Sequence, residues 1–280
     1  MARTAGLLTL HGMGGEKRGY ADDLLRDLAD ALDDAWARVA VESVHYQAAI
    51  QGRQEDIFAA MAPLVDWHAL RRFFLYGFSD AVTLEHRADE PGSPYHAAQR
   101  RVRRSLDRLF DALEPAPGGA LRPLVVVAHS LGCQVLSNYL WDAQKPGPAS
   151  RGVFAVDDPG VPRGSPRDRF RRLESLRLLV TTGCNIPLFV AGRSRIVPFA
   201  RPNPGFEWLN LYDEDDVLGW PLRPLYDERA DIVTDVRVNA GGGLLGTLTS
   251  AWNPFSHGNY WTDREVQRPL VDALREAVAP

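Results

Sequence analysis

The chain has 280 residues, of which 45% are hydrophobic and 24% are charged, and its formal net charge is −4 at pH 7. This composition is that of a globular protein and excludes a disordered one, and the acidic balance argues against a dedicated nucleic-acid surface. The length is enough for one sizeable hydrophobic core, and the sequence has no linker between two cores. We therefore expect a single domain over residues 1–280.

No stretch of the sequence approaches the roughly 18 apolar residues that a membrane span needs, and the apolar run near the N-terminus is too short for a signal peptide. We therefore expect a soluble, cytoplasmic protein that makes no integral membrane contact. The two cysteines, Cys133 and Cys184, are expected to be buried free thiols, because nothing in the sequence indicates an oxidising compartment.

The first half of the chain has the hydrophobic pattern of alternating strands and helices. The apolar run at 5–10 ends in the glycine-rich HGMGG, which is typical of a buried strand that opens into a loop. An amphipathic helix is predicted over 20–38 and a second strand over 39–44. Most of 53–115 has helical periodicity, and this helical region ends at Pro115.

The second half of the chain contains the strongest strand signal, LVVVA at 124–128. An uninterrupted β-branched run suits a strand that is covered on both faces of a parallel sheet. A helix is predicted directly after it, at 131–143. The rest of the pattern consists of three strands and a closing helix, at 176–182, 206–211, 232–238 and 263–278. This alternation predicts the α/β class, with a mostly parallel sheet of about six strands flanked by helices.

Residues 145–172 interrupt this alternation. They are rich in proline, glycine and arginine and have neither helical nor strand periodicity. We therefore expect them to leave the sheet as an excursion and to form a lid.

The segment VVVAHSLG at 125–132 carries the clearest chemical signal. A strand that turns into a helix at a serine with small neighbours matches the nucleophile-elbow pattern, in which a strained turn exposes the hydroxyl of the serine, here Ser130. Ala128 replaces the first glycine of that pattern. A serine that only caps an ordinary helix is the alternative interpretation.

A serine nucleophile needs a histidine base and a carboxylate that orients the base. If the chain order is serine, acid, histidine, the base is His257, because no other histidine follows Ser130. The acid is expected in the loop LNLYDEDDVLGWPL. We favour Asp216, because the apolar VLGWPL after it would bury this loop, whereas Asp213 and Asp215 are expected to be solvated turn or capping residues.

Two backbone N–H groups are expected to stabilise the oxyanion. One belongs to Leu131, at the N-terminus of the helix after the serine, where free N–H groups and the helix dipole favour negative charge. The other belongs to Met13, in the loop after the first strand, where Gly12 permits a sharp bend.

The order HGMGG, AHSLG, an acid loop and a late histidine resembles the α/β-hydrolase superfamily, of the serine esterase and lipase type, over nearly the whole chain. The segments at 181–189 and 215–225 are similar to parts of lipase-like and intracellular phospholipase-like members, including the DDHD-type group. The resemblance implies an α/β-hydrolase fold whose sheet lacks the first two strands of the superfamily. It also implies the nucleophile, acid, base and two oxyanion amides at Ser130, Asp216, His257, Met13 and Leu131.

These features predict a hydrolase that cleaves a small-molecule or lipid carboxylic ester through an acyl-enzyme. An acyltransferase or thioesterase with the same residues, and a non-catalytic ligand-binding protein on a hydrolase scaffold, remain open. GGGLLG at 241–246 formally matches a dinucleotide-binding pattern, but the sequence after it does not predict the helix and strand that such a site needs. Metal-ligand spacing is also missing from the sequence, so we predict no cofactor.

Overall fold

A parallel sheet of six strands forms the centre of the protein. The computed structural model describes residues 1–12, 19–47, 54–85, 90, 92–145, 151–226, 230–240 and 260–279. The strand order is β2-β1-β3-β4-β5-β6, and every neighbouring pair is parallel. The strands are β1 (Ala5–Leu10), β2 (Val39–Val44), β3 (Leu124–His129), β4 (Leu176–Thr182), β5 (Glu207–Tyr212) and β6 (Thr234–Arg237). The α/β class and the six-stranded sheet predicted from the sequence are confirmed.

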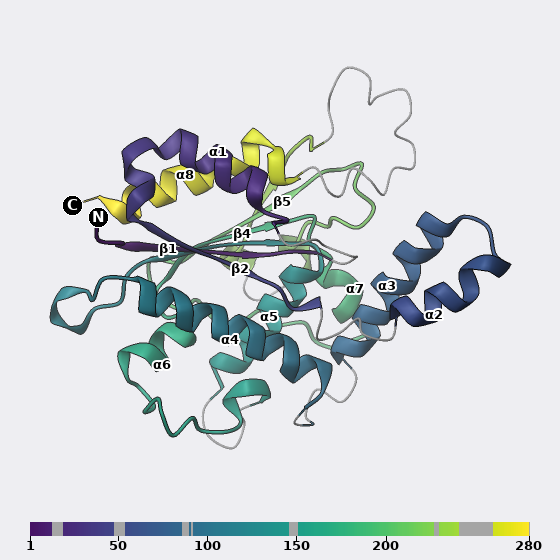
Figure 1. Ribbon diagram of the computed structural model, residues 1–280, viewed down its shortest axis with the longest axis horizontal. Coiled ribbons are helices and arrows are strands. Elements are labelled where there is room, and N and C mark those ends of the chain that lie inside the picture. Colours follow the sequence, from purple (N-terminus) through teal and green to yellow (C-terminus); the bar gives the residue numbers. More distant parts are fainter. Residues whose placement is uncertain are drawn as a thin grey trace.

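Helices cover both faces of this sheet (Figure 1). On one face, α1 (Asp22–Leu32) and α8 (Arg264–Val278) pack side by side. The other face carries α4 (Pro94–Ala112), α5 (Leu131–Ala143), α6 (Pro166–Arg171) and α7 (Ile186–Val190). Two further helices of the described residues, α2 (Gln54–Met61) and α3 (His68–Glu85), form a hairpin that projects from the side of the molecule.

The sheet buries a separate apolar cluster on each face. All six residues of β3 are buried, as its uninterrupted β-branched run predicted. Val126 and Leu8 belong to the cluster that includes α4 and α5. Val125, Val127 and Leu7 point the other way and belong to the cluster that includes α1 and α8. The alternation of side chains along each strand therefore divides one apolar run between two cores.

Two predicted segments differ from the structure. The helix expected over 20–38 ends at Leu32, and a 3₁₀ helix, Asp33–Arg38, completes the segment. The segment 145–172 was expected to lack regular structure, but it contains α6. Its N-cap, Ser165, accepts a hydrogen bond from the backbone N–H of Asp168, and Pro166 opens the helix. Serine followed by proline is a helix start signal, so this short helix could have been read from the sequence.

Two further observations concern the cysteines and the hydropathy of the helices. Cys133 and Cys184 are buried and unbridged, as predicted. In the part of the chain that the structure describes, no helix combines the length and the hydropathy needed to cross a membrane.

Gly132 allows α5 to begin directly against the end of β1. A Cβ atom at this position would lie 2.5 Å from the carbonyl oxygen of His11 and 3.0 Å from that of Leu10. Backbone oxygens cannot move aside as a flexible side chain can, so only glycine fits here without a shift of the strand or the helix. This close approach sets the position of the residues that precede Gly132 at the turn into α5.

We predict that Gly132→Ala destabilises the protein by about 1–3 kcal/mol, because the added methyl group overpacks the contact between α5 and β1. Helix propensity alone would give the opposite sign, about 1 kcal/mol of stabilisation. Urea unfolding followed by circular dichroism measures the difference. Gly192→Ala is the matched control, since a Cβ there would meet no described atom within 4 Å. Equal stability of the two variants would contradict the close approach.

Candidate active site

Ser130 occupies the turn between β3 and α5. Its φ of 51° and ψ of −121° lie in a region that residues with a side chain rarely adopt, and such a conformation costs on the order of 1–3 kcal/mol. Two hydrogen bonds hold the turn: the N–H of Ser130 donates to the carbonyl of Thr182, and the carbonyl of Ser130 accepts from the N–H of Cys133, both at 2.9 Å. The strained strand-turn-helix arrangement that the sequence predicted is present.

The side chain of Ser130 is buried, with 0% of its surface exposed. The prediction of an exposed hydroxyl is wrong, because Gly12 packs over the turn: a Cβ atom on Gly12 would lie 2.8 Å from Cβ and 3.3 Å from Oγ of Ser130. Among the described residues, Oγ has no hydrogen-bond partner. A buried hydroxyl without a partner costs about 1–3 kcal/mol, and backbone strain of this kind occurs most often at active sites and ligand sites.

Leu131 is the first residue of α5, and it is fully buried. Its N–H is one of the four at the start of a helix that no helix carbonyl can accept. The positive end of the helix dipole lies at the same place, next to the hydroxyl of Ser130. The arrangement can therefore stabilise negative charge that develops beside this serine.

The residues after β1 are held through one backbone carbonyl. The oxygen of Gly12 accepts hydrogen bonds from Nδ1 of His11 at 2.8 Å, the hydroxyl of Tyr46 at 3.3 Å and Nε2 of Gln47 at 3.4 Å. The Tyr46 hydroxyl also donates to the His11 carbonyl at 2.6 Å. These three hydrogen bonds hold the carbonyl of Gly12 in one orientation. Sequence analysis missed Tyr46 and Gln47, which follow β2 without any motif.

His11 is held in its neutral form. Since a carbonyl oxygen only accepts, Nδ1 carries the proton, and Nε2 is buried without a partner among the described residues. Burial lowers the pKa of His11 from its usual 6.5 to about 4; the hydrogen bond to Gly12 opposes this effect and His45 adds to it. The ring stacks on Tyr46 with 4.3 Å between centroids.

We predict that His11 makes stability depend on pH between about 6.5 and about 4. The unfolded chain binds a proton on His11 below pH 6.5 and the folded chain does not, so the free energy of unfolding falls as the pH falls. At 1.36 kcal/mol per pKa unit, the loss reaches about 3 kcal/mol by pH 4. Urea unfolding of the wild type and His11→Asn at several pH values measures it. The account fails if the two proteins lose stability in parallel.

Asp216 is buried in the loop after β5. Its Oδ1 accepts from the N–H of Leu218 and its Oδ2 from the hydroxyl of Tyr260, both at 3.0 Å. A Cβ on Gly219 would lie 2.6 Å from Oδ2 of Asp216 and 3.2 Å from Cα of Gly183, just past the end of β4. The Ser130 turn is bonded to the last residue of β4, so Ser130 and Asp216 flank the carboxyl end of the same strand.

The neighbouring carboxylates play different parts. Asp215 is exposed, as predicted. Asp213 was expected to be a solvated turn or capping residue. It does cap, as it accepts from the N–H groups of Asp215 at 2.9 Å and Ala240 at 2.8 Å, but the expected solvation is wrong, because the side chain is buried. The second bond links the end of β5 to the residues after β6. Asp213 is therefore a capping residue, and it is buried by the cap it forms.

Tyr260 joins the two buried carboxylate residues, and no motif in the sequence indicated this role. Its hydroxyl donates to Asp216 and accepts from the N–H of Asp213 at 3.0 Å. Burial, and then the charge of Asp216, raise the pKa of Tyr260 far above its usual value. The hydroxyl therefore stays protonated and holds the carboxylate of Asp216 in one orientation.

We predict that Tyr260→Phe lowers the free energy of unfolding by about 1–3 kcal/mol, because one buried N–H and one buried carboxylate oxygen lose a partner. Urea unfolding at pH 7 measures the effect. Tyr226→Phe is the control, as Tyr226 is another buried tyrosine and lies outside this network. If both variants lose the same stability, the hydroxyl of Tyr260 does not hold the carboxylates.

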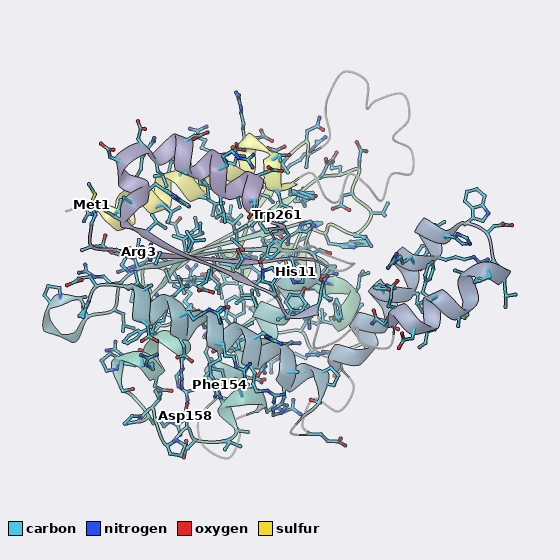
Figure 2. All side chains as sticks on the ribbon, in the orientation of Figure 1. Met1, Arg3, His11, Phe154, Asp158 and Trp261 are labelled. Carbon is cyan, nitrogen blue, oxygen red and sulfur yellow. The ribbon has the colours of Figure 1, made fainter. Side chains whose placement is uncertain are left out.

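Three of the five predicted site residues are described, namely Ser130, Leu131 and Asp216. Met13 and His257 lie outside the described residues, as does the GGGLLG segment at 241–246. His129, next to the serine, bonds through Nδ1 to Oγ1 of Thr182 at 3.1 Å. Figure 2 shows His11 and Trp261 at the end of the sheet where β1 finishes, with Phe154 and Asp158 well away from them.

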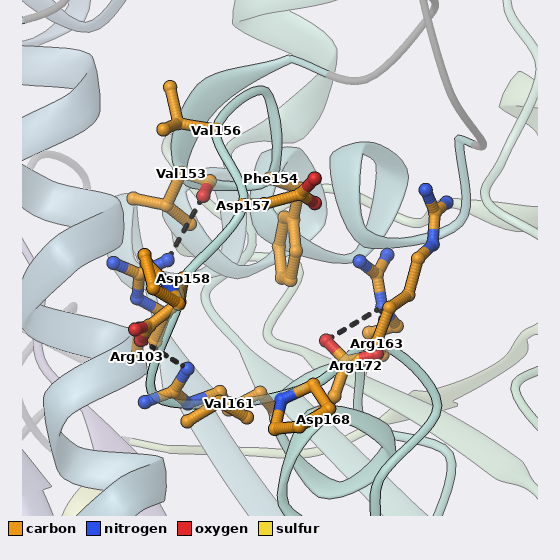
Figure 3. A pocket seen from close by; sticks show the side chains of 13 residues that line it. Arg103, Val153, Phe154, Val156, Asp157, Asp158, Val161, Arg163, Asp168 and Arg172 are labelled. Carbon is orange, nitrogen blue, oxygen red and sulfur yellow. Dashed lines mark hydrogen bonds and ion pairs between the residues drawn. The ribbon is translucent and has the colours of Figure 1, made fainter.

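A separate hollow of about 360 Å³ lies beside α4 and α6, around Phe154 (Figure 3). Both acidic and basic side chains line this hollow. Four of them form ion pairs with each other: Arg171 with Asp158 at 2.9 Å, and Arg172 with Asp168 at 3.1 Å. These ion pairs connect the excursion at 151–172 internally and do not reach the carboxyl ends of the strands. This hollow is thus separate from the site around Ser130.

Neither the protein-family models nor the curated proteins compared with this chain include a match. Within the described residues, His, Cys, Asp and Glu side chains form no group of three or more that could hold a metal ion. The function must therefore be inferred from the geometry around Ser130.

Proposed function

We propose that the protein is a serine hydrolase with an α/β-hydrolase fold that cleaves carboxylic esters through an acyl-enzyme intermediate. The observation that carries this proposal is Ser130, whose hydroxyl is unpaired among the described residues on a strained turn between a buried strand and a helix N-terminus. A serine that only caps a helix would accept a hydrogen bond from the N–H groups of the first turn. Ser130 makes no such side-chain bond.

The order of the strands supports the same proposal. Ser130 follows β3 and Asp216 follows β5, with only β4 between them in the sheet. His257 comes after β6 in the sequence. Ligands of open parallel sheets bind at the carboxyl ends of the strands, where these three segments begin. This order, serine, acid, histidine, is the one that the resemblance to α/β-hydrolases implies.

In the proposed reaction, His257 takes the proton of Ser130 as Oγ attacks the ester carbonyl carbon. The N–H groups of Leu131 and Met13 stabilise the oxyanion. When it collapses, the ester bond breaks, and the alcohol leaves with the proton from His257. Water, deprotonated by the same imidazole, then releases the acid and regenerates Ser130. Asp216 orients the imidazole and stabilises its charged form, without taking its proton.

Access to the serine is part of this proposal. Because the Ser130 side chain is fully buried, the site has to open before an ester carbonyl can reach Oγ. The lid role of 145–172 stays a prediction; in the structure, this excursion is tied to α4, through Arg171 and Asp107 at 2.6 Å. The ester itself is a small molecule or a lipid.

The test is the initial rate of hydrolysis on p-nitrophenyl esters from acetyl to palmitoyl. We expect Ser130→Ala to lose more than about 10³-fold in kcat, because the nucleophile is removed. Ser175→Ala is the matched control, because the Ser175 hydroxyl is also buried and lacks a partner among the described residues. Ser175 lies just before β4, at the amino end of the strand, whereas Ser130 lies at the carboxyl ends of the strands. This variant should keep the wild-type rate.

Asp216→Asn is the second variant of this test, and we expect it to retain the fold and to lose a smaller part of the rate than Ser130→Ala. A wild-type protein that hydrolyses no ester of the series, or a Ser130→Ala variant that keeps full activity, would contradict the proposal.

A further inference from the structure

Buried polar atoms without a partner lie where three neighbouring strands end. Among the described residues, Nε2 of His11, Oγ of Ser130, and both Nδ2 and Oδ1 of Asn185 are buried and make no hydrogen bond. These residues follow β1, β3 and β4, which are adjacent in the sheet. Buried polar groups are nearly always paired, and ligands of open parallel sheets bind at the carboxyl ends of the strands. The unpaired atoms therefore indicate a ligand that brings polar groups of its own.

Asn185 is the residue of this set that the proposed reaction and the packing leave unexplained. Its side chain is fully buried, and its neighbours Cys184 and Ile186 belong to the apolar cluster that includes α4 and α5. An amide in such surroundings costs free energy unless its donors and its acceptor are paired. An asparagine at a helix N-cap normally accepts a hydrogen bond from the first turn, but Asn185 precedes α7 without making this bond. No hydrogen bond of the described residues accounts for this amide.

Asn185 lies next to both segments that carry the proposed nucleophile and acid. The N–H of Ser130 donates to the carbonyl of Thr182 at 2.9 Å, and Asn185 follows Thr182 by three residues. Since β3 and β4 are paired up to this point, one strand spacing of about 4.8 Å and a short length of chain separate the two positions. The carbonyl of Cys184 accepts from the N–H of Trp220 at 3.0 Å, in the loop that contains the proposed acid.

The chemistry of the amide selects the group that it can bind. Nδ2 only donates and Oδ1 only accepts, so the full partner is a pair of neighbouring groups of which one accepts and the other donates. Two neighbouring hydroxyl groups meet this requirement. A sugar ring holds such a pair at a fixed spacing, so little conformational freedom is lost when the pair is bound. An apolar ester would leave the amide unpaired, and unpaired site groups are what reject a substrate most strongly.

An ester of a sugar places hydroxyl groups close to the ester bond. When one hydroxyl of a sugar is esterified, the remaining hydroxyls stay a few bonds away from the ester carbonyl. With the carbonyl carbon at Oγ of Ser130, these hydroxyls can reach a residue that lies one strand away, as Asn185 does. The positions of the two residues therefore match the distance between the ester bond and the free hydroxyls of such a substrate.

We propose that Asn185 determines the substrate class of this site, and that its amide binds two neighbouring hydroxyl groups of a sugar whose ester bond is cleaved at Ser130. Nδ2 donates to one hydroxyl oxygen, and Oδ1 accepts from the other hydroxyl. The reaction consumes one water and releases the sugar and the carboxylic acid. This inference rests on the proposed function for the reaction at Ser130, and on the unpaired amide for the nature of the substrate.

The first test compares two butyrate esters, one of the primary hydroxyl of glucose and one of cyclohexylmethanol, which has a similar ring without hydroxyls. We expect the wild type to show a kcat/KM at least about 10-fold higher for the glucose ester. Asn185→Leu keeps the size of the side chain and removes its polar atoms. This variant should lose at least about 10-fold in kcat/KM for the glucose ester and stay within about 2-fold of the wild type for the other ester.

The second test separates substrate binding from a structural role. Because the Asn185 amide has no partner among the described residues, we expect Asn185→Leu to unfold at the same temperature as the wild type or higher. Asn210→Leu is the matched control, since Asn210 is also fully buried but bonds to Thr181 at 2.9 Å and Asp235 at 2.7 Å. Its unfolding temperature should fall. Asn185→Ala is measured in parallel as a smaller variant, and circular dichroism confirms that each variant is folded.

The third test measures binding without catalysis. The butyl ether of the glucose primary hydroxyl cannot be hydrolysed, and isothermal titration calorimetry follows its binding. We expect the wild type to bind this ether at least about 10-fold more tightly than Asn185→Leu does. A wild type that cleaves neither ester but shows this difference in binding would contradict the proposed hydrolase and support the role of Asn185.

Other results would overturn the inference about Asn185. One is a wild type that cleaves both esters with equal kcat/KM, or an Asn185→Leu variant that loses activity equally on both; either result leaves the proposed hydrolase standing. Another is an unfolding temperature of both Asn185 variants as low as that of Asn210→Leu, which a structural amide paired with a buried water would give. The last is a wild type that does not bind the ether, or binds it no more tightly than Asn185→Leu.

Discussion

The close approach of β1 and α5 is the constraint on which the rest of the site depends. Gly12 and Gly132 have no Cβ atom, and at both positions that atom would collide with the opposite segment. The helix can therefore start at the end of the strand, and the turn between β3 and α5 is forced into the positive φ of Ser130. One packing contact thus produces the backbone strain, the burial of the serine and its place at the helix N-terminus.

The chain stabilises this strained region from both sides with polar groups that have no catalytic part in the proposed reaction. On one side, His11, Tyr46 and Gln47 fix the carbonyl of Gly12. On the other side, Tyr260 fixes the carboxylate of Asp216. Both sets of bonds are buried, where hydrogen bonds are strong and a missing partner is costly. Preorganised groups of this kind let a site stabilise charge without rearranging during a reaction.

Much of the fold could be predicted from the sequence because it depends on local patterns. The β-branched run of β3 indicated a strand buried on both faces, and the small residues around Ser130 indicated the strained turn. The roles of Tyr46 and Tyr260 depend on contacts between segments 34 and 44 residues apart in the chain, and no local pattern encodes such contacts. The burial of Ser130 was missed for the same reason, since it comes from the packing of Gly12.

The central claim is that Ser130 is an activated nucleophile, and covalent labelling by a fluorophosphonate tests it most directly. Attack of Oγ on phosphorus forms the phosphonate ester, expels fluoride and passes the serine proton to the base. The account predicts one phosphonyl group per chain, located on Ser130 by peptide mass spectrometry and absent from heat-denatured protein. Labelling at any other residue, or none after prolonged exposure of the folded protein, would contradict it.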